Sequence, residues 1–466
     1  MTVTTLILIL VVVNNIWAGL NVYNGIALLR SKASKWVAHN SKSSIEKLTR
    51  VNAIGLPRIT LLIAAYHEAE VISSTLNFCS RLRYPKDKLE IIVITEEDDK
   101  DTRRAIAPAL KHYSFIKSVV VTKDNKLPKG KPRALNEGLA YATGDIIGVL
   151  DAEDVVEPDL LLKVAQKITF DGYDVVQGIL DPVNDGSSWF SLMERAEYGY
   201  WYRYYLEALE KTGYPMPLGG TTNFMKRSVF DEIGAWKAGA LTEDFELGMR
   251  LYNSGKKVGS FYASTEHSSE NHGLMHGVIG SYGDWNYRKP YKIGMLNAVT
   301  KEESPQDWSA WHRQRTRWQQ GKIQTFRTYV KEPPIGFWKK FHVYIAVAQP
   351  HIAFINLLGI ALNVYAMLIG EIFPTPLLLL TYINFCGILM YCTMSSYGYL
   401  KMAEKRNPHE RIMRALIVFI STPAYWAFQW VSDLRAMKRE YVNHSTVWFK
   451  TEHIGHASKK GGEPQK

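Results

Sequence analysis

The chain has 466 residues, of which 46% are hydrophobic, and this is enough for one large domain or two medium ones. Its mean hydropathy of −0.15 excludes a protein that lies in the membrane throughout, but dense apolar runs occur near both ends. We therefore expect a soluble domain that is attached to transmembrane helices. The net charge of +11 comes from no long basic tract or nucleic-acid-binding motif, so we predict no nucleic-acid partner.

The first apolar segment, residues 5–29, is longer than the roughly 20 residues that cross a bilayer. A cleaved signal peptide carries positive charge before its apolar stretch, whereas here Arg30, Lys32 and Lys35 follow it. Basic residues on this side favour a cytoplasmic position for the following domain and contact with membrane lipids. We predict an uncleaved transmembrane anchor in residues 1–30.

Short β-branched runs alternate with helix-like segments in the middle of the chain. Helices are expected at 69–81 and 131–142, and strands at 59–65, 90–95, 117–122, 145–150 and 173–178. This alternation predicts an α/β fold, with a mostly parallel sheet and helices on both faces. Neither G-x-G-x-x-G nor a P-loop motif occurs, so bound phosphates would depend on a metal ion and basic side chains.

Residues 144–154 end an apolar run in three carboxylates, Asp151, Glu153 and Asp154. In an open α/β sheet, ligands bind beyond the carboxyl ends of the strands, and clustered carboxylates suit a hard divalent cation. A strand followed by a solvated acidic turn gives the same pattern. Charged residues after other strands support a site: His67, Glu68 and Glu70, then residues 96–99, then Lys129, Lys131 and Arg133.

Residues 189–211 are rich in Trp, Tyr and Phe at helical spacing. Core packing explains most of these aromatic residues, and a channel wall or a helix on the membrane surface is the alternative. Both interpretations place a helix here.

Three apolar segments follow residue 337, at about 342–369, 376–400 and 412–434, and each is long enough to span a bilayer. The positive-inside rule places the basic loop at 401–414 in the cytoplasm. Three crossings would then leave the C-terminal segment outside, although that segment is also basic. Either one segment, near Pro350 or Pro423, is re-entrant or interfacial, or the number of crossings differs by one.

Two later motifs add to the charged residues at the predicted strand ends. Residues 218–224 read LGGTTNF and precede the TED of residues 242–244, and residues 314–318 read QRTRW. Together with the carboxylates and the Lys131 turn, this ordered set resembles the membrane-embedded family 2 glycosyltransferases, which include cellulose, chitin and hyaluronan synthases. The resemblance covers about residues 61–318, and residues 448–453 resemble a W-x-K-T-x-H ending of one bacterial and archaeal subgroup.

The resemblance implies a GT-A-type fold and a cytoplasmic glycosyltransferase domain at 55–330, followed by membrane or interfacial helices at 336–435 and a cytoplasmic segment at 436–466. The implied enzyme is an inverting, metal-dependent hexosyl- or N-acetylhexosaminyltransferase of the cell membrane. It would extend a β-linked polysaccharide processively and export it. The alternatives are transfer of one sugar to a lipid or lipid-linked glycan, and a non-catalytic membrane partner or transport subunit. UDP-sugars are favoured as donors, and GDP-sugars are possible.

The resemblance also implies roles for individual residues. Asp244 would be the general base, with Glu243 beside it. Asp151 would hold Mg²⁺ or Mn²⁺ with either Glu153 or Asp154, because DAED replaces the family's D-x-D. The early acidic cluster matches the family in more than one register, with Asp98 favoured. The implied donor-binding residues are Glu97, Asp98, Lys131, Asp151 and Arg317, and the implied acceptor-binding residues are Gly220, Thr221, Gln314 and Trp318.

Between Asp244 and Gln314 the chain is longer than the family's usual connection. We predict an insert at about 267–302 that acts as a lid or an acceptor-binding element. His267, Glu270 and His272 suggest a second metal site, and a polar surface loop is the other interpretation.

Overall fold

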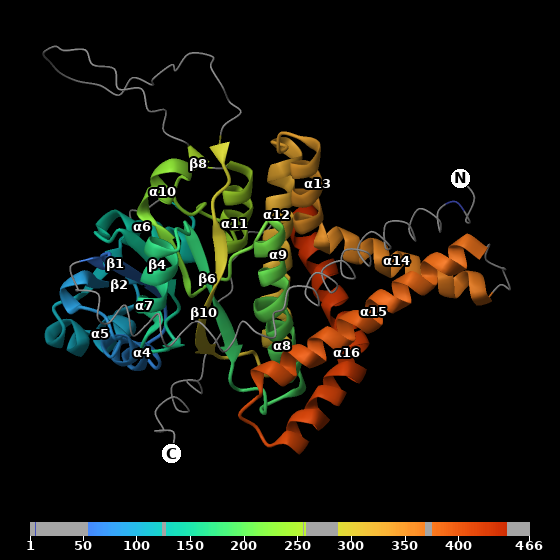
Figure 1. Ribbon diagram of the computed structural model, residues 1–466, viewed down its shortest axis with the longest axis horizontal. Helices are drawn as coiled ribbons and strands as arrows, with labels where there is room; N and C mark the ends of the chain where they lie inside the picture. The colour runs from blue at the N-terminus through green and yellow to red at the C-terminus, as the bar shows by residue number, and fades with distance from the viewer. Residues whose placement is uncertain are drawn as a thin grey trace, which may run out of the picture.

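The computed structural model describes Thr5 and residues 55–123, 127–254, 256–257, 288–368 and 375–444. Within these residues, an eight-stranded sheet has the order β3-β2-β1-β4-β7-β6-β10-β5 (Figure 1). Its strands are β1 (Ile59–Ala65), β2 (Leu89–Glu96), β3 (Ile116–Val121), β4 (Ile146–Leu150), β5 (Val155–Val156), β6 (Val175–Pro182), β7 (Asn223–Lys226) and β10 (Ile293–Glu302). A separate hairpin pairs β8 (Lys256–Lys257) with β9 (Arg288–Lys289).

The sheet is mixed. Strands β1 to β4 run parallel, β7 lies antiparallel between β4 and β6, and β10 runs parallel to β6. The short β5 closes the far edge in antiparallel pairing with β10. The α/β class is therefore confirmed, and the carboxyl ends of β1, β2, β4, β6 and β10 meet at one edge, where ligands bind in such sheets.

One difference from the sequence prediction concerns the proposed insert at 267–302. Its last ten residues form β10, which pairs along β6 inside the sheet, and Ala298 of this strand is fully buried. Residues 267–287 lie outside the described part of the chain. Residues 293–302 therefore belong to the sheet.

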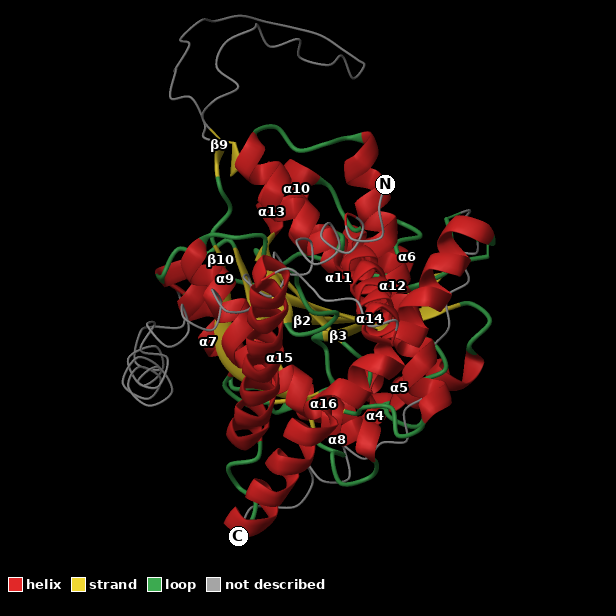
Figure 2. Cartoon of the chain, turned by 90° about the vertical axis from the view of Figure 1, so that its right-hand side faces the viewer, coloured by secondary structure: helices red, strands yellow, loops and turns green. Residues whose placement is uncertain are grey.

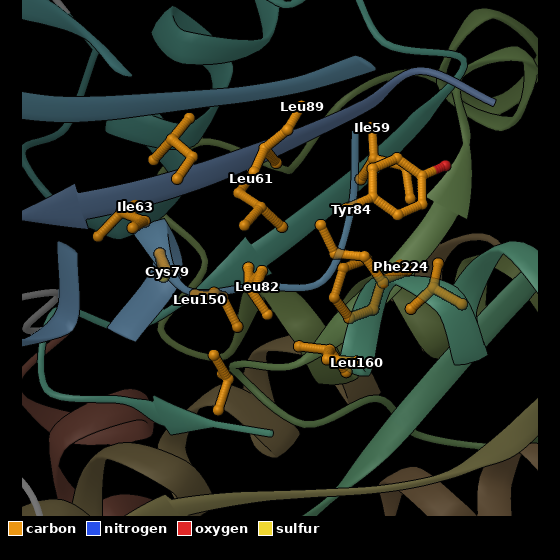
Figure 3. Close-up of a cluster of buried hydrophobic side chains, with 14 of the residues drawn as sticks. Ile59, Leu61, Ile63, Cys79, Leu82, Tyr84, Leu89, Leu150, Leu160 and Phe224 are labelled. Carbon is orange, nitrogen blue, oxygen red and sulfur yellow. The ribbon is translucent and has the colours of Figure 1, made fainter. Parts of the chain in front are cut away.

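Helices cover both faces of the sheet because successive side chains of a strand point to opposite sides. Leu61 and Ile63 of β1 lie in one apolar cluster and Leu62 lies in the other. Figure 3 shows the first cluster, where Leu61 and Ile63 lie near Cys79. This face is covered by α4 (Ile72–Ser80), α5 (Lys100–His112) and α7 (Leu160–Ala165); the other is covered by α6 (Lys131–Tyr141), α10 (Arg227–Ile233) and α11 (Glu243–Ser254).

The aromatic segment at 189–211 is helical, as predicted, and lies between the sheet and the C-terminal helices (Figures 1 and 2). It comprises α8 (Trp189–Tyr200), η5 (Trp201–Tyr205) and α9 (Leu206–Thr212). Two glycines allow α8 to approach the C-terminal helices closely, since a Cβ atom on Gly199 would lie 2.6 Å from the carbonyl carbon of Gly398. The C-terminal helices are α12 (Trp308–Lys331), α13 (Phe337–Val347), α14 (Gln349–Leu368), α15 (Thr375–Met402) and α16 (Pro408–Met437).

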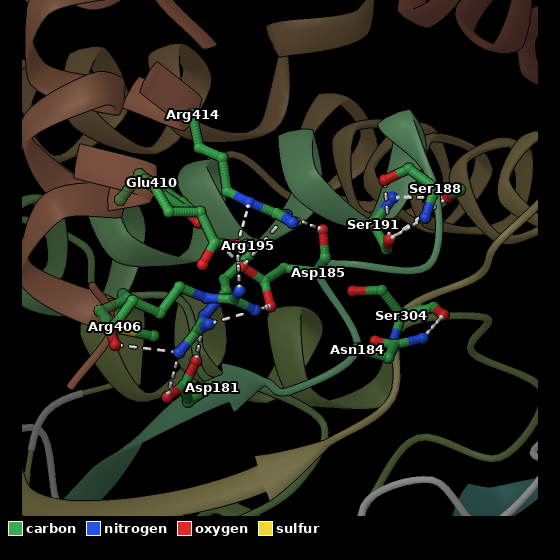
Figure 4. A network of polar contacts seen from close by, with 12 residues as sticks. Asp181, Asn184, Asp185, Ser188, Ser191, Arg195, Ser304, Arg406, Glu410 and Arg414 are labelled. Atoms are coloured by element: carbon green, nitrogen blue, oxygen red, sulfur yellow. Dashed lines mark hydrogen bonds and ion pairs between the residues drawn. The ribbon is translucent and has the colours of Figure 1, made fainter. Parts of the chain in front are cut away.

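Buried ion pairs join the loop after β6 to the turn between α15 and α16 (Figure 4). The Asp185 carboxylate accepts hydrogen bonds from Tyr399 at 3.0 Å and Arg406 at 2.5 Å, and lies 3.1 Å from the Arg195 guanidinium. Arg414 donates to the Asp185 carbonyl oxygen at 2.9 Å. These contacts fix the helical part on the sheet domain.

In the described residues, one helix, Pro408–Val442, is long and apolar enough to cross a membrane. The pair Phe337–Val347 and Gln349–Gly359 also qualifies when taken together, but it is bent by 68° at its break. Pro350 explains the break, because it lacks an amide hydrogen and its ring clashes with the preceding turn. At Pro423, by contrast, α16 continues without interruption. The predicted anchor at 1–30, apart from Thr5, and the motif at 448–453 lie outside the described residues.

Candidate active site

A cavity of about 1010 Å³ opens at the carboxyl edge of the sheet and continues between the C-terminal helices. Most of the residues singled out in the sequence line its wall. They are Lys131, Asp151, Glu153, Gly220, Thr221, Glu243, Asp244, Gln314, Arg317 and Trp318.

Lys131 connects two parts of this wall. It lies in the first turn of α6, and its ammonium group donates hydrogen bonds to the Asp151 carboxylate and, at 2.8 Å, to the Gly220 carbonyl oxygen. Burial alone would lower the pKa of Lys131, but Asp151, Glu243 and Asp244 raise it above its usual value. Lys131 is therefore a permanent positive charge in the cavity wall.

The turn after β4 separates its three carboxylates. The buried Asp154 carboxylate accepts hydrogen bonds from the backbone N–H of Asp151 at 2.8 Å and from the Thr221 hydroxyl. Asp151 N–H also donates to the Thr221 hydroxyl at 3.1 Å. Asp154 thus holds the turn together and is not among the residues that line the cavity, whereas Asp151 and Glu153 line it.

The carboxylates at this edge carry more negative charge than Lys131 balances. Burial raises the pKa of Asp154, and repulsion from Asp151 and Glu153 raises it further. The pKa of Glu302, at the end of β10, is raised by burial and by the same carboxylates. No group of three His, Cys, Asp or Glu residues in the described ranges is arranged to hold a metal alone. Two carboxylates that share a Mg²⁺ or Mn²⁺ with substrate phosphates nevertheless fit this excess charge.

Asp244 lies in the first turn of α11, opposite Gly220. A Cβ atom on Gly220 would lie 3.5 Å from Oδ2 of Asp244 and 3.8 Å from Nζ of Lys131, so the missing side chain leaves both groups open. Burial raises the pKa of Asp244, although the Phe245 amide, Lys131 and Arg317 partly oppose it. Burial and the Asp244 charge raise the pKa of Glu243 to about 7. A carboxylate with a raised pKa is suited to accept a proton.

The two arginines of QRTRW have different contacts. Arg315 is buried between Glu197 at 2.7 Å and Glu194 at 3.1 Å, so it anchors α12 on α8. Arg317 donates to the Leu241 carbonyl oxygen at 3.2 Å. The Nε atoms of both arginines are buried without a hydrogen-bond partner in the described residues, and both side chains line the cavity. Arg315 is paired with two carboxylates, whereas the hydrogen bond of Arg317 goes to a backbone carbonyl, which leaves the charge of Arg317 for a ligand in the cavity.

Trp318 lines the cavity from the next position of α12. Its ring stacks on Tyr198 with centroids 6.4 Å apart, and the Arg315 guanidinium lies 4.5 Å from its centroid. The Oε1 atom of Gln314 is buried without a hydrogen-bond partner among the described residues and also belongs to a cavity-lining side chain. Both residues offer contacts of the kind that sugars use, an aromatic ring and a hydrogen-bonding amide.

Two predicted donor-binding residues lie away from the wall. Asp98 is half exposed and pairs with Lys129 at 2.8 Å, and Glu97 accepts a hydrogen bond from the Lys123 amide at 2.9 Å. Glu96 lines the cavity instead and pairs with Arg133 at 2.5 Å. The roles of Glu97 and Asp98 stay predictions.

Several other residues that line the cavity were not predicted individually as site residues. They include Tyr66, Glu68, Glu96, Tyr198, Tyr202 and Glu302. Glu68 and Glu96 belong to the charged residues that follow predicted strands, and Tyr198 and Tyr202 belong to the aromatic segment for which a channel wall was the alternative interpretation.

Curated relatives are similar to this chain over different lengths. "Probable glycosyltransferase YdaM" of Bacillus subtilis is 29% identical over 282 residues, 58% of this chain and 57% of the relative. "Beta-monoglucosyldiacylglycerol synthase" of Synechocystis sp. is 24% identical over 411 residues, 86% of this chain and 76% of the relative. "Poly-beta-1,6-N-acetyl-D-glucosamine synthase" of Staphylococcus aureus is 27% identical over 217 residues, 46% of this chain and 50% of the relative. The chain thus spans little more than half the length of YdaM.

A solved structure shares the fold. The mannosyltransferase PcManGT from Pyrobaculum calidifontis, solved in complex with GDP-Man and Mn²⁺, has a TM-score of 0.54 and 16% identity, covering 90% of this chain and 99% of that chain. The likeness shows a GT-A-like sheet with flanking helices. The family model described as "Glycosyltransferase like family 2" matches residues 57–321, more than half of the chain. The chain therefore belongs to the family 2 glycosyltransferases.

Proposed function

We propose that the chain transfers a sugar, with inversion, from a nucleotide-diphosphate sugar to an acceptor hydroxyl. One observation carries the proposal: Asp151, Glu153, the charged Lys131 and the half-buried Asp244 all line one cavity at the carboxyl edge of the sheet. A paired carboxylate site, a cation and a base are what displacement of a diphosphate requires. Their presence also argues against a non-catalytic subunit.

Asp151 and Glu153 would hold a divalent metal ion, since both line the cavity and Asp154 does not. The Asp154 Oδ2 atom accepts from Thr221 and the Asp151 amide, while its Oδ1 atom is buried without a hydrogen-bond partner in the described residues. When bound, Mg²⁺ or Mn²⁺ neutralises charge on the diphosphate. Lys131 and Arg317 would contact the same leaving group and disperse its charge. The Mn²⁺ and GDP-Man bound by the mannosyltransferase of similar fold support this ligand class.

Asp244 would accept the proton of the acceptor hydroxyl as that oxygen attacks the anomeric carbon. The bond from this carbon to the diphosphate oxygen breaks on the opposite side, so an α-linked donor gives a β-linked product. Trp318 would stack on the acceptor, and Gln314 would bind its hydroxyl groups. Glu243 has a pKa of about 7, and its ionisation would be coupled to that of Asp244.

We also propose that the transferase domain is attached to a membrane through the helices on either side of it. Residues 336–435 would supply membrane and interfacial helices, with the transferase domain in the cytoplasm and the anchor at 1–30 on the same membrane. The bent pair α13 and α14 and the apolar α16 support this arrangement.

Two acceptor classes fit this proposal. The match to the glucosyldiacylglycerol synthase covers 86% of this chain and so extends beyond residues 57–321, which favours transfer of one sugar to a lipid. The match to the poly-N-acetylglucosamine synthase supports the second candidate, a growing β-linked polysaccharide.

The test is a donor-depletion screen with the purified full-length chain in membranes, followed by sizing of the product. Consumption of one nucleotide-diphosphate sugar in the presence of Mn²⁺ is expected. A single lipid product supports one transfer, and a ladder supports polymerisation. If no nucleotide-diphosphate sugar is bound or consumed, the proposed function is wrong.

A further inference from the structure

The loop at residues 236–242 connects α10 to α11 and leads directly into the helix that carries Asp244. The Glu246 amide donates to the Thr242 carbonyl oxygen at 3.1 Å, so the first turn of α11 starts from the last residue of this loop. Asp244 lies in that turn. The position of its carboxylate therefore depends on where the loop is held.

Side chains of two other helices hold the two ends of the loop. At the first end, Asn136 of α6 donates to the Trp236 carbonyl oxygen at 2.7 Å and accepts from the Trp236 amide at 3.0 Å. At the second end, Oε1 of Gln324 accepts from the Leu241 amide at 3.2 Å, and Arg317 donates to the Leu241 carbonyl oxygen at 3.2 Å. Trp236 and Leu241 thus each have both backbone polar groups bound by side chains.

The contacts of α12 with the second end come from one face of this helix. Arg317, Gly321 and Gln324 are four and then three residues apart, which places them on the same side. A Cβ atom on Gly321 would lie 2.1 Å from Oγ1 of Thr242, so a side chain at this position would push the helix away from the loop. The helix that presents Trp318 to the cavity therefore also holds the start of α11.

The middle of the loop is separated from α12 by a second cavity of about 250 Å³. Residues 237–240 line it on one side, and Gln324, Thr325 and Thr328 line it on the other. Lys237 donates to the Thr328 hydroxyl at 3.1 Å, which is an exposed contact. Close packing fixes most protein segments, and an open space removes that constraint here. The hydrogen bonds of Leu241 therefore carry much of the attachment of the loop to α12.

We infer that Gln324 is a positioning residue for the reaction. By holding the Leu241 amide, it fixes the start of α11 and directs the Asp244 carboxylate toward the acceptor hydroxyl. Gln324 lies outside the TED and QRTRW motifs and is not among the residues that line the larger cavity. The inference rests on the proposed function, because it requires Asp244 to act as the base. A base displaced by about 1 Å can slow a reaction about a hundredfold, so such a residue affects the rate without touching the substrate.

The experiment compares variants of the full-length chain in membranes, with the donor identified by the depletion screen. Gln324→Met keeps the length of the side chain and removes the accepting oxygen. It should lower kcat at least about tenfold, while the donor KM, nucleotide binding and Tm stay close to those of the unmodified chain. Gln324→Glu retains an accepting oxygen and should keep kcat within about threefold of the unmodified value.

The matched control is Gln166→Met, which makes the same substitution at another half-buried glutamine. Gln166 donates to Asp171 at 2.7 Å, and it lines neither cavity. This variant should leave kcat and the donor KM unchanged.

An unchanged kcat in Gln324→Met would overturn the inference, as would equal losses of kcat in Gln324→Met and Gln324→Glu. A loss of kcat in Gln324→Met accompanied by a matching loss of nucleotide binding and Tm would show a structural role only, and would also overturn it. In each case the unmodified chain still turns over its donor, so the proposed function survives. Failure of the unmodified chain to bind or consume any nucleotide-diphosphate sugar would instead remove the proposed function, and this inference with it.

Discussion

The Lys131 ammonium group lies against the Asp151 carboxylate and joins the first turn of α6 to the end of β4. The same nitrogen contacts the Gly220 carbonyl oxygen, next to Asp244. One side chain thus ties the proposed metal and diphosphate site to the proposed base. A substitution of Lys131, Asp151 or Asp244 should therefore change the surroundings of the other two side chains.

Glu153→Gln should raise the Mn²⁺ concentration needed for half-maximal activity by at least about tenfold, because it removes one of two proposed metal-binding carboxylates. Activity should disappear with EDTA and return with Mn²⁺. Asp154→Asn is the matched control, since Asp154 holds the turn and does not line the cavity. A larger shift in the Mn²⁺ requirement for Asp154→Asn than for Glu153→Gln would reverse the assignment.

Thr221→Val should lower the stability of the domain by about 1–3 kcal/mol, measured as a lower Tm, because buried groups lose their hydrogen-bond partner. The Thr221 hydroxyl accepts from the Asp151 amide and donates to Asp154. Thr212→Val, near the end of α9, removes a half-buried hydroxyl and should change stability by less than about 0.5 kcal/mol. Equal effects of the two variants would contradict the role given to Thr221.

Much of the sheet domain followed from the sequence because buried strands and amphipathic helices leave periodic patterns. The strand expected at 59–65 matches β1, and the helix expected at 131–142 matches α6 to within one residue. The antiparallel β7 was not foreseen, since its four residues are too short to show a pattern. The role of β10 was also missed, because nothing local in residues 293–302 distinguishes a sheet strand from an insert.

Residues of the cavity wall were predictable where a motif fixes the residue type, as at Asp151, Lys131 and Asp244. It was not predictable where the choice depends on side-chain direction. Glu153 and Asp154 are adjacent in the sequence, yet Glu153 lines the cavity and Asp154 bonds to the backbone. The part of the cavity between the C-terminal helices is lined by residues of α12, α14, α15 and α16, which lie far apart in the chain, so no short stretch of sequence predicts it.

The pH dependence of kcat/KM should report the coupled pair Asp244 and Glu243. A base works in its ionised form, so activity should fall as the pH is lowered through the raised pKa of the pair. Burial and the Asp244 charge raise the pKa of Glu243 to about 7, so Glu243 is neutral at the lower pH where Asp244 ionises. Glu243→Gln keeps this neighbour neutral at every pH, so the acid limb set by Asp244 should stay in place. An acid limb that moves to lower or higher pH in Glu243→Gln would show that Asp244 alone does not set it.

Asp185→Asn should destabilise the protein by about 3–5 kcal/mol, because it removes a buried carboxylate shared by the buried Arg195 and the half-buried Arg406. The control is Asp101→Asn, which breaks an ion pair whose two side chains are 78% and 77% exposed and should leave Tm unchanged. An unchanged Tm in Asp185→Asn would show that this junction does not hold the helices to the sheet.

The pH dependence of stability adds a second measurement for Asp185. Burial alone would raise the pKa of this carboxyl, but Arg195 and Arg406 lower it below its usual value of 3.8. Its contribution is therefore present above about pH 4 and is lost as the pH falls through the lowered pKa of the folded state. Between neutral pH and about pH 3, the difference in Tm between the unmodified protein and Asp185→Asn should narrow.

The central claim is that Asp244 deprotonates the acceptor, and Asp244→Asn tests it most directly. With the donor found by the depletion screen, nucleoside diphosphate release by the variant should fall by at least about a hundredfold. Nucleotide binding and Tm should remain close to those of the unmodified chain. Release at an undiminished rate from Asp244→Asn, with nucleotide bound and the protein folded, would contradict the claim.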